Sequence, residues 1–394
     1  MAQLGQIAWL VPPLRLLAAL VASAIAAALL TTLAVAGGPV DLPRARGSHV
    51  RPTPTSGGLA VMAATGLITG AFVLMYGAAI PGNWRDGALL FGFASLMGLS
   101  GALDDLFDLP AKLRLGFQVA ACLVFAAFFR VTTLDFGPGL IVHLWPPIGW
   151  IGSAAWLVLG INTLNFMDGA NGLAPGTQAI ALIVLSILIL LLAPVSLLGG
   201  FLGVTLIVCV CAAGAHIGFM PFNLPPRSPN VARAFQGDAG ALFGGALITG
   251  ACLVVKAYGV GSVWFGGFLL APLLVDVVLT LVARARHGSN LMRPHKEHLY
   301  QLWLQRRDPS HAGLALRVWF LCALSSGVGV AARIYDHIYH SDVRFFCLVA
   351  VLAAYALMWG ALRQQLLKAE PLTGAVEAPA ELDGERVAIG EKPS

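Results

Sequence analysis

The feature of this chain that most restricts its fold is a series of apolar runs, each about 20 residues long, the length of helix that spans a bilayer. Of its 394 residues, 58% are hydrophobic and only 11% are charged, and the mean hydropathy is +0.81. That composition leaves too little polar surface for a water-soluble protein of this size. Gly and Ala recur in every run and allow close helix packing in lipid. We predict an all-α, polytopic membrane bundle with about eleven transmembrane helices.

The predicted spans occupy residues 1–368, which we interpret as one transmembrane catalytic domain. Residues 369–394 are rich in Ala, Glu, Pro and Gly, a composition that predicts a disordered cytoplasmic tail. The expected spans are residues 15–36, 57–80, 87–103, 113–130, 147–163, 173–193, 195–215, 239–258, 262–283, 314–335 and 342–364.

The basic residues of the loops predict the orientation of these spans. If the loop after the first span is cytoplasmic, the inside loops carry thirteen Lys and Arg residues and the outside segments six. We therefore expect a periplasmic N-terminus and a cytoplasmic C-terminus. The pI near 9.0 then reflects topology and contact with anionic membrane lipids, and gives no reason to expect a nucleic acid. A cleaved signal peptide ending at Ala34-Val35-Ala36 is the alternative for the first span.

Four polar clusters interrupt the apolar chain, all in loops predicted to face the same side of the membrane. Carboxylates, amides, histidines and basic groups gathered at one face suit charge-rich phosphate chemistry on a lipid. The clusters are residues 46–58, residues 104–108, residues 162–169, and residues 235–238 together with 293–298.

Asp104, Asp105 and Asp108 close the third predicted span. Asp104 and Asp108 are four residues apart and share a helix face. Such a group can hold Mg²⁺, orient a magnesium-bound diphosphate or accept a proton from a phosphate. The alternative is a solvated stop signal at a helix end. Lys112 and Arg114 follow, and either neutralise a phosphate or simply flank a span.

Asn162, Asn165 and Asp168 form a polar stripe at the end of the fifth predicted span. Helix capping explains the turn that follows, but explains Asn162 poorly because that residue still lies in the span. Asp238 stands between two glycines just before the eighth span. A metal ligand and an ordinary helix cap are equally compatible with that position.

His295 and His298 lie three residues apart in a loop with Arg293. A convincing third zinc ligand is lacking, so contacts to a nucleotide diphosphate or a sugar fit better, with a plain surface loop as the alternative. Asp276, inside the ninth predicted span, is interpreted as a residue that holds the ligand-binding side chains in position, or as a structural acid. The six cysteines lie in apolar runs without paired metal spacing, which favours core positions.

Taken together, the motifs resemble those of the polyprenyl-phosphate N-acetylhexosamine-1-phosphate transferases, glycosyltransferase family 4. Five motifs occur in the family's order between about residues 41 and 301, and five in register are far more specific than one. The first and last loops look closer to the O-antigen-initiating branch than to the peptidoglycan branch. The motifs are Pro-Thr-Pro-Thr-Ser-Gly-Gly at 52–58, Gly-Ala-Leu-Asp-Asp-Leu-Phe-Asp at 101–108, Asn-Thr-Leu-Asn-Phe-Met-Asp-Gly at 162–169, Gly-Asp-Ala-Gly at 237–240, and Arg-Pro-His-Lys-Glu-His at 293–298.

The resemblance implies an activity. Undecaprenyl phosphate would attack the β-phosphorus of a UDP-N-acetylhexosamine, giving undecaprenyl-diphospho-sugar and UMP, the first step of a cell-surface polysaccharide such as the O-antigen of lipopolysaccharide. It implies a Mg²⁺-dependent phosphotransferase, with Mn²⁺ as a substitute, in the bacterial inner membrane with its active site facing the cytoplasm. A homodimer is compatible with the family.

The resemblance also implies roles for individual residues. Asp238 would bind the metal, while Asp104, Asp105 and Asp168 would be catalytic. Asp276 would support them. Substrate binding is assigned to Arg51, Asp108, Lys112, Asn162, Asn165, Asn223, Arg293, His295 and His298.

Some positions depart from the family pattern. Asn171 replaces a common second acid, Gln236 replaces a usual apolar residue, and Ala241 stands where Ser is frequent. The link 225–231 is longer than usual.

Other functions remain open from the residues alone. An intramembrane prenyltransferase would need a second Asp-rich cluster, a CDP-alcohol phosphotransferase a denser one, and a secondary transporter acids near the midplane. The sugar (GlcNAc, GalNAc, QuiNAc or FucNAc) and the choice between direct attack and a covalent intermediate are also open, as are the oligomeric state and the downstream polysaccharide.

Overall fold

The structure is a computed structural model, and it confirms the all-α polytopic fold. It describes residues 13–37, 40–41, 53–76, 84–198, 200–227, 231–291, 293 and 295–372. Within those ranges, ten helices are long and apolar enough to cross a membrane. They are α2 (Pro13–Gly37), α3 (Gly57–Tyr76), α4 (Arg85–Phe107), α5 (Ala111–Phe128), α6 (Pro146–Phe166), α7 (Leu173–Leu192), α9 (Gly203–Asn223), α10 (Gly237–Ala257), α14 (His311–Tyr339) and α15 (Arg344–Lys368).

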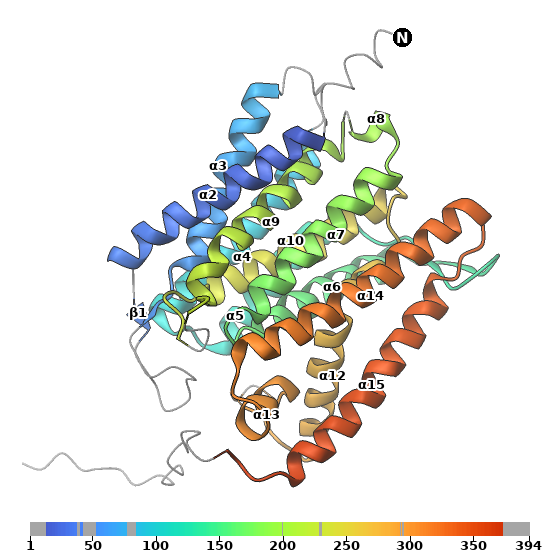
Figure 1. Cartoon of the computed structure of the whole chain (residues 1–394). Helices are drawn as coiled ribbons and strands as arrows, with labels where there is room; N and C mark the ends of the chain where they lie inside the picture. Colours follow the sequence, from blue (N-terminus) through green and yellow to red (C-terminus); the bar gives the residue numbers. More distant parts are fainter. Residues whose placement is uncertain are drawn as a thin grey trace, which may run out of the picture.

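Shorter elements connect the long helices (Figure 1). The short helices are α8 (Val195–Leu198), α11 (Phe265–Leu269), α12 (Ala271–Arg286) and α13 (Leu299–Arg306). Two antiparallel strand pairs complete the described chain: β1 (Val40–Asp41) with β2 (Thr53–Pro54), and β3 (Thr133–Asp135) with β4 (Ile141–His143).

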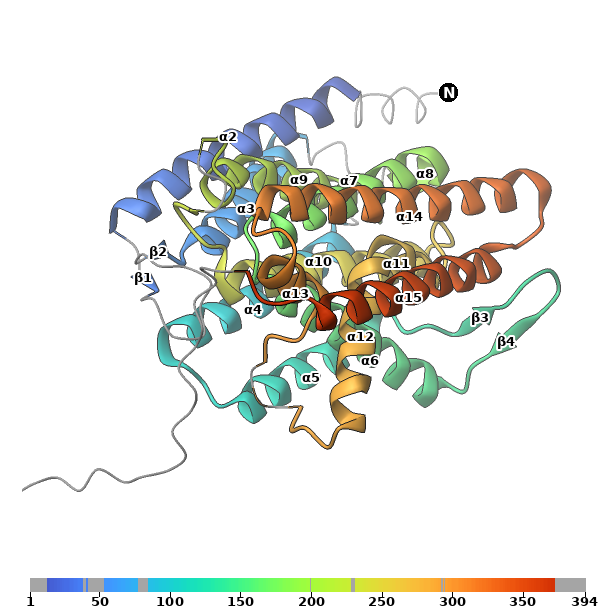
Figure 2. The ribbon, with the colours of Figure 1, turned by 60° about the horizontal axis from the view of Figure 1, so that its bottom comes forward.

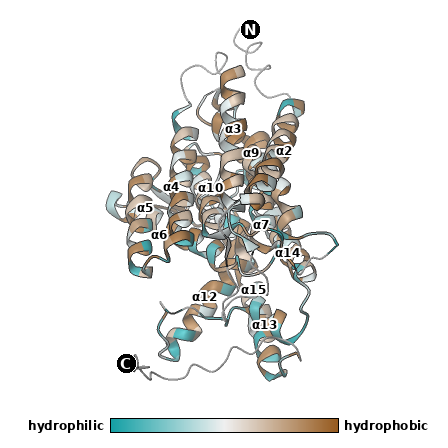
Figure 3. Ribbon diagram, turned by 90° about the vertical axis from the view of Figure 1, so that its left-hand side faces the viewer, coloured by the Kyte–Doolittle hydropathy of each residue, from teal (hydrophilic) through white to brown (hydrophobic). Residues whose placement is uncertain are grey.

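Helix α10 forms the centre of the bundle, with almost all of its residues buried. It packs against α3, α4, α6 and α7, and Figure 2 shows these helices around it. The peripheral helices α2 and α15 instead expose large apolar side chains such as Leu14, 75% exposed, and Leu357, 77% exposed. Apolar residues on the outside are expected where lipid is the solvent, and Figure 3 shows hydrophobic ribbon along the long helices. The protein is therefore a multi-pass membrane protein.

Small residues bring the helices together, as the composition predicted. Gly218 of α9 faces the backbone of Ala24 in α2, and a Cβ at this glycine would overlap the carbonyl oxygen of Ala24. The backbones of α2 and α9 can therefore approach closely at this point.

The ninth predicted span, 262–283, is wrong as a continuous helix. The chain forms α11 and then α12, with a break at Leu270. Pro272 lies in the first turn of α12 and has no N–H to continue a helix from the preceding turn. Neither piece is long enough to count among the ten spanning helices. Figure 3 shows the more polar α12 and α13 extending beyond one end of the bundle.

The seventh predicted span, 195–215, is displaced in the structure. Residues 195–198 form the separate helix α8, and α9 runs from Gly203 to Asn223. The run continues past both ends of the prediction without an Asp, Glu, Lys or Arg residue, so hydropathy could not position the helix. The start of the predicted disordered tail also differs. Ala369 and Leu372 dock on α13, where Leu372 N donates to Gln305 O at 2.9 Å. The rest of the tail lies outside the described residues.

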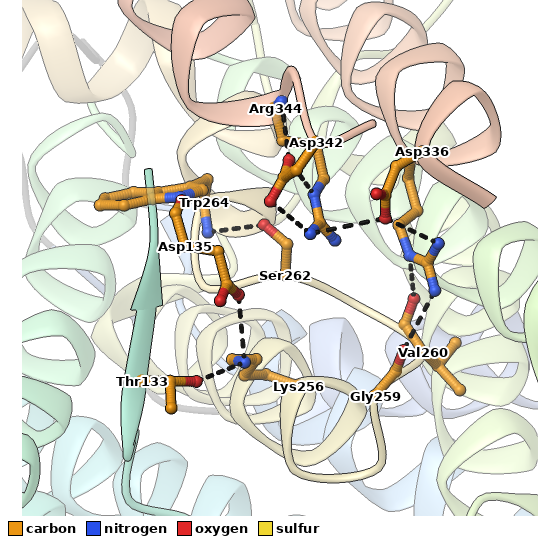
Figure 4. A network of polar contacts seen from close by, with 11 residues as sticks. Thr133, Asp135, Lys256, Gly259, Val260, Ser262, Trp264, Asp336, Asp342 and Arg344 are labelled. Atoms are coloured by element: carbon orange, nitrogen blue, oxygen red, sulfur yellow. Dashed lines mark hydrogen bonds and ion pairs between the residues drawn. The ribbon is translucent and has the colours of Figure 1, made fainter. Parts of the chain in front are cut away.

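A network of polar side chains lies near the C-terminal end of α10 (Figure 4). Lys256 lies about 27 Å along α10 from Asp238 at 1.5 Å per residue, and pairs with Asp135 of β3 at 3.5 Å. Arg344 pairs with Asp342 at 2.7 Å and with Asp336 at 3.5 Å. Arg333 joins Asp336 and donates to the carbonyls of Gly259 and Val260. Three bases balance three acids, so the network ties β3, the α10–α11 loop and the α14–α15 turn without net charge.

Candidate active site

The polar clusters meet at one end of the bundle. Helices α4, α6 and α9 end there, while α3, α5, α7 and α10 begin there. Contacts between clusters distant in sequence show the convergence: Asp105 with Asp238, Asn165 with Asp238, and Asp168 with Gln236. The predicted gathering of these segments at a common face is confirmed for the residues that the structure describes. Which side of the membrane this face occupies stays a prediction.

The first cluster is described from Thr53 onward and lies against the start of α10. Gly57 N donates to Phe235 O at 3.1 Å, and Gly58 N to Gln236 O at 3.0 Å. A Cβ on Gly58 would overlap the backbone of Gly240, so this contact needs glycine. The predicted anion ligand Arg51 lies outside the described residues.

Asp105 caps the helix that carries Asp238. Its Oδ1 accepts from Asp238 N at 3.2 Å and its Oδ2 accepts from Ala239 N at 3.4 Å. These are N–H groups of the first turn of α10, which have no partner within the helix. Gly237 makes the approach possible, because its φ is +63° and a Cβ there would overlap the Asp105 carboxylate. The alternative that Asp238 caps its own helix is therefore wrong, and its carboxylate serves other contacts.

The Asp238 carboxylate is held from two further helices. Asn165 Nδ2 of α6 donates to Oδ1 at 2.9 Å, and Arg114 Nη1 of α5 lies 3.3 Å from Oδ2. The same Arg114 nitrogen pairs with Asp104 Oδ2 of α4. The Asp238 side chain keeps 31% of its surface exposed, whereas Asp104 keeps 9%. Asp238 is thus the more accessible of the two acids that share Arg114.

Asp168 lies in the loop between α6 and α7, and Gln236 Nε2 donates to its Oδ1 at 2.9 Å. Burial raises the pKa of the Asp168 carboxyl well above its ordinary value, the Gln236 hydrogen bond opposes this, and the charge of Asp238 adds to it. Gln236 is therefore a site residue that the sequence marked only as a departure from the family pattern.

Hydrogen bonds from residues of α9 and α13 hold the Asp168 loop in position. Tyr300 donates its hydroxyl to Phe166 O at 3.1 Å, and Asn223 Oδ1 accepts from Gly172 N at 2.6 Å. Asn223 Nδ2 in turn donates to Ala234 O at 3.1 Å, and its side chain is buried. Both ends of the Asn223 amide are therefore used within the protein. In this arrangement the amide holds together the loops that carry the acids, and its role as a substrate ligand stays a prediction.

The loop that carries His295 and His298, here called the histidine loop, packs beside the end of α6. The His298 ring lies 6.0 Å from that of Phe166 and 4.7 Å from that of His295. Burial, His295 and the nearby arginines lower the pKa of His298 to about 3, and burial and Arg284 lower that of His295. Both rings are therefore neutral near pH 7.

Asp276 anchors the start of α13, directly after His298, and its support of the site stays a prediction. Its Oδ1 accepts from Leu299 N at 2.9 Å, from Thr280 Oγ1 at 3.1 Å and from Trp359 Nε1 at 3.0 Å. One carboxylate therefore joins α12, α13 and α15. Arg284, which lies on the same helix as Asp276, pairs with Glu297.

The remaining predicted ligands lie further from these contacts. Asn162 Nδ2 donates to Gln118 Oε1 at 2.9 Å and to Val158 O, so it joins α5 and α6. Asp108, Lys112 and Arg293 are exposed. Their substrate-binding roles stay predictions.

Carboxylate oxygens are the donors that Mg²⁺ prefers, and the acids gathered here match that chemistry. Within the described ranges, however, no three His, Cys, Asp or Glu side chains are grouped closely enough to hold a metal ion. Arg114 supplies the positive charge between Asp104 and Asp238 instead. A carboxylate is a donor type that suits Mg²⁺, and the binding of the ion at Asp238 stays a prediction.

The sequence of this chain is similar to those of known membrane transferases. Residues 88–256 match the family model described as glycosyl transferase family 4. The chain is 30% identical over 313 residues to decaprenyl-phosphate N-acetylglucosaminephosphotransferase of Mycolicibacterium smegmatis, covering 69% of this chain and 70% of that protein. It is 28% identical over 321 residues to phospho-N-acetylmuramoyl-pentapeptide-transferase of Mycolicibacterium paratuberculosis, covering 71% and 84%. The chain belongs to glycosyl transferase family 4, the polyprenyl-phosphate sugar-1-phosphate transferases.

Proposed function

We propose that this protein transfers N-acetylhexosamine-1-phosphate from a UDP-sugar to a polyprenyl phosphate, undecaprenyl phosphate in the first instance. The products are a polyprenyl-diphospho-sugar and UMP, and the step starts a cell-surface polysaccharide, for which O-antigen is one candidate. The active site faces the cytoplasm from the inner membrane. The observation that carries the proposal is the cluster of Asp104 and Asp105 at the end of α4, Asp168 after α6 and Asp238 at the start of α10, joined by Arg114, Asn165 and Gln236.

In-line phosphoryl transfer depends on positioning and charge neutralisation more than on covalent assistance. Mg²⁺ bound at Asp238 would neutralise the diphosphate of the sugar nucleotide. Asn165 orients the Asp238 carboxylate through its 2.9 Å hydrogen bond. Asp105 holds the first turn of α10 in place, so that Asp238 is presented from a helix end and not from a mobile loop.

Asp104 and Arg114 suit the acceptor phosphate, because a carboxylate and a guanidinium side by side can take up a proton and bind an anion. Asp168 lies close enough to Asp238 for their charges to interact, and both burial and the charge of Asp238 raise its pKa. The neutral His295 and His298 would donate hydrogen bonds to the diphosphate or sugar. We favour direct attack by the lipid phosphate.

The test uses the purified protein in detergent with undecaprenyl phosphate, MgCl₂ and a panel of UDP-N-acetylhexosamines. The proposal expects lipid-dependent release of UMP with at least one donor. Release should stop with EDTA and in Asp238→Asn. Release of UDP would mean ordinary glycosyl transfer. Absence of nucleotide release from every donor would reject the proposal and favour the prenyltransferase or transporter hypotheses.

A further inference from the structure

Arg114 is a charged group that joins three helices at the site. It extends from the first turn of α5, and its Nη1 contacts Asp104 of α4 and Asp238 of α10 together. Two carboxylates at the ends of adjacent helices repel each other unless a positive charge lies between them. The guanidinium provides that charge, while 37% of the Arg114 side chain remains exposed.

We propose that Arg114 is the internal counter-cation of this site, which holds Asp104 and Asp238 together until Mg²⁺ takes its place at Asp238. The inference rests on the proposed function, in which Asp238 binds the metal. Arg114 and the ion are then alternatives at Asp238 Oδ2, because two positive charges cannot share that oxygen without strong repulsion.

Two features of the site support an exchange and not a permanent ion pair. Asp104 is held independently, since its Oδ1 accepts from Leu109 N at 2.9 Å, and Asp238 is held by Asn165. Neither acid therefore depends on Arg114 alone for its position. Because Arg114 is partly exposed, its side chain can move outward when Mg²⁺ binds. The displaced guanidinium would then face an incoming phosphate.

The exchange has a measurable consequence. A resident positive charge competes with a metal ion, so its removal must strengthen metal binding in the absence of any substrate. Lys112 provides the matched control, because it carries the same charge two residues away but is exposed to solvent, which screens its effect.

The experiment measures Mn²⁺ binding to the purified full-length protein, from the electron paramagnetic resonance signal of the free ion, without lipid or nucleotide. We expect Arg114→Gln to bind Mn²⁺ about tenfold more tightly than the wild type, and Lys112→Gln to differ by less than about twofold. Arg114→Lys keeps the charge and should bind like the wild type. Asp238→Asn should lose the binding, which places the ion at this site.

Unchanged or weaker Mn²⁺ binding in Arg114→Gln would overturn the inference and leave Arg114 as a structural link. If Arg114→Gln does not fold, Arg114→Met gives the same comparison, because it removes the charge and preserves the apolar stem. A wild type that binds Mn²⁺ at Asp238 but releases no UMP would refute the proposed function alone. Failure of both the wild type and Arg114→Gln to bind Mn²⁺ would refute the counter-cation.

Discussion

The carboxylate of Asp105 accepts hydrogen bonds from the backbone of Asp238 and Ala239, so that an acid of α4 caps the helix bearing the proposed metal ligand. Asp105 and Asp238 are 133 residues apart in the chain. Their contact makes the position of Asp238 depend on α4. A change at Asp105 therefore alters both the stability of α10 and the geometry of the site.

Asp105→Ala should destabilise the protein by about 1 kcal/mol, the usual cost of a lost helix cap. UMP release should fall by at least about tenfold, because Asp238 loses its support. Thermal unfolding and the nucleotide assay check the two effects. Asp105→Asn keeps one acceptor oxygen and should lose less stability than Asp105→Ala. Equal stability of Asp105→Ala and the wild type would contradict the capping role.

Gln236→Leu should shift the acid limb of the pH–activity profile to higher pH. The Gln236 hydrogen bond lowers the pKa of Asp168, which burial raises, so its loss raises that pKa further. If the ionised carboxylate is the active form, activity is lost as pH falls through this pKa, and the loss begins earlier in the variant. The initial rate of UMP release across the pH range measures the shift. A limb that stays in place or moves to lower pH would rule out this role.

Asn223→Leu should lower the free energy of unfolding by about 1–3 kcal/mol, because it leaves buried backbone groups of Gly172 and Ala234 without partners. Chemical or thermal unfolding in detergent tests this. Metal binding should stay close to that of the wild type. A variant with normal stability and a large increase in KM would instead support the substrate contact predicted from the sequence.

His298 should make the protein less stable in mild acid. Its folded pKa of about 3 lies below the ordinary value of 6.5, so the unfolded chain takes up a proton that the folded protein resists. Stability is therefore complete above about pH 6.5 and declines as pH falls below it. His298→Gln should lose less of its melting temperature between about pH 7.5 and about pH 5 than the wild type. An identical loss in the two proteins would contradict the assignment.

Lys256→Met should destabilise the protein without changing catalysis. It leaves Asp135 without its basic partner in a half-buried network, a change that costs up to about 3 kcal/mol. Because Lys256 lies at the far end of α10, the rate of UMP release at a temperature where the variant stays folded should match that of the wild type. A selective loss of activity would show that the two ends of α10 are coupled.

The sequence predicted which segments meet, because successive spans place their polar ends at alternating faces. Asp104, Asn165 and Asp238 were expected at one face for this reason, and they lie together. The contacts within the cluster could not be predicted. That Arg114 joins Asp104 and Asp238 depends on how α5 packs beside α4 and α10. Spacing along the chain carries no signal of that packing.

Buried polar residues were harder to interpret than exposed ones. Asn223 is a predicted ligand and Gln236 a departure from the family pattern, yet Asn223 joins two loops and Gln236 supports Asp168. The break at Leu270 shows a similar limit. Pro272 signalled it, but the surrounding residues are apolar enough to read as one span.

The most direct test of the central claim follows the β-phosphorus of the donor. A UDP-N-acetylhexosamine labelled with ³²P at the β-phosphate is incubated with undecaprenyl phosphate, MgCl₂ and the purified protein, and the lipid is extracted. The account predicts that the label enters the lipid fraction together with the sugar, while unlabelled UMP is released, and that Asp238→Asn abolishes the transfer. Label that remains in a released UDP, with or without sugar on the lipid, would contradict phosphosugar transfer.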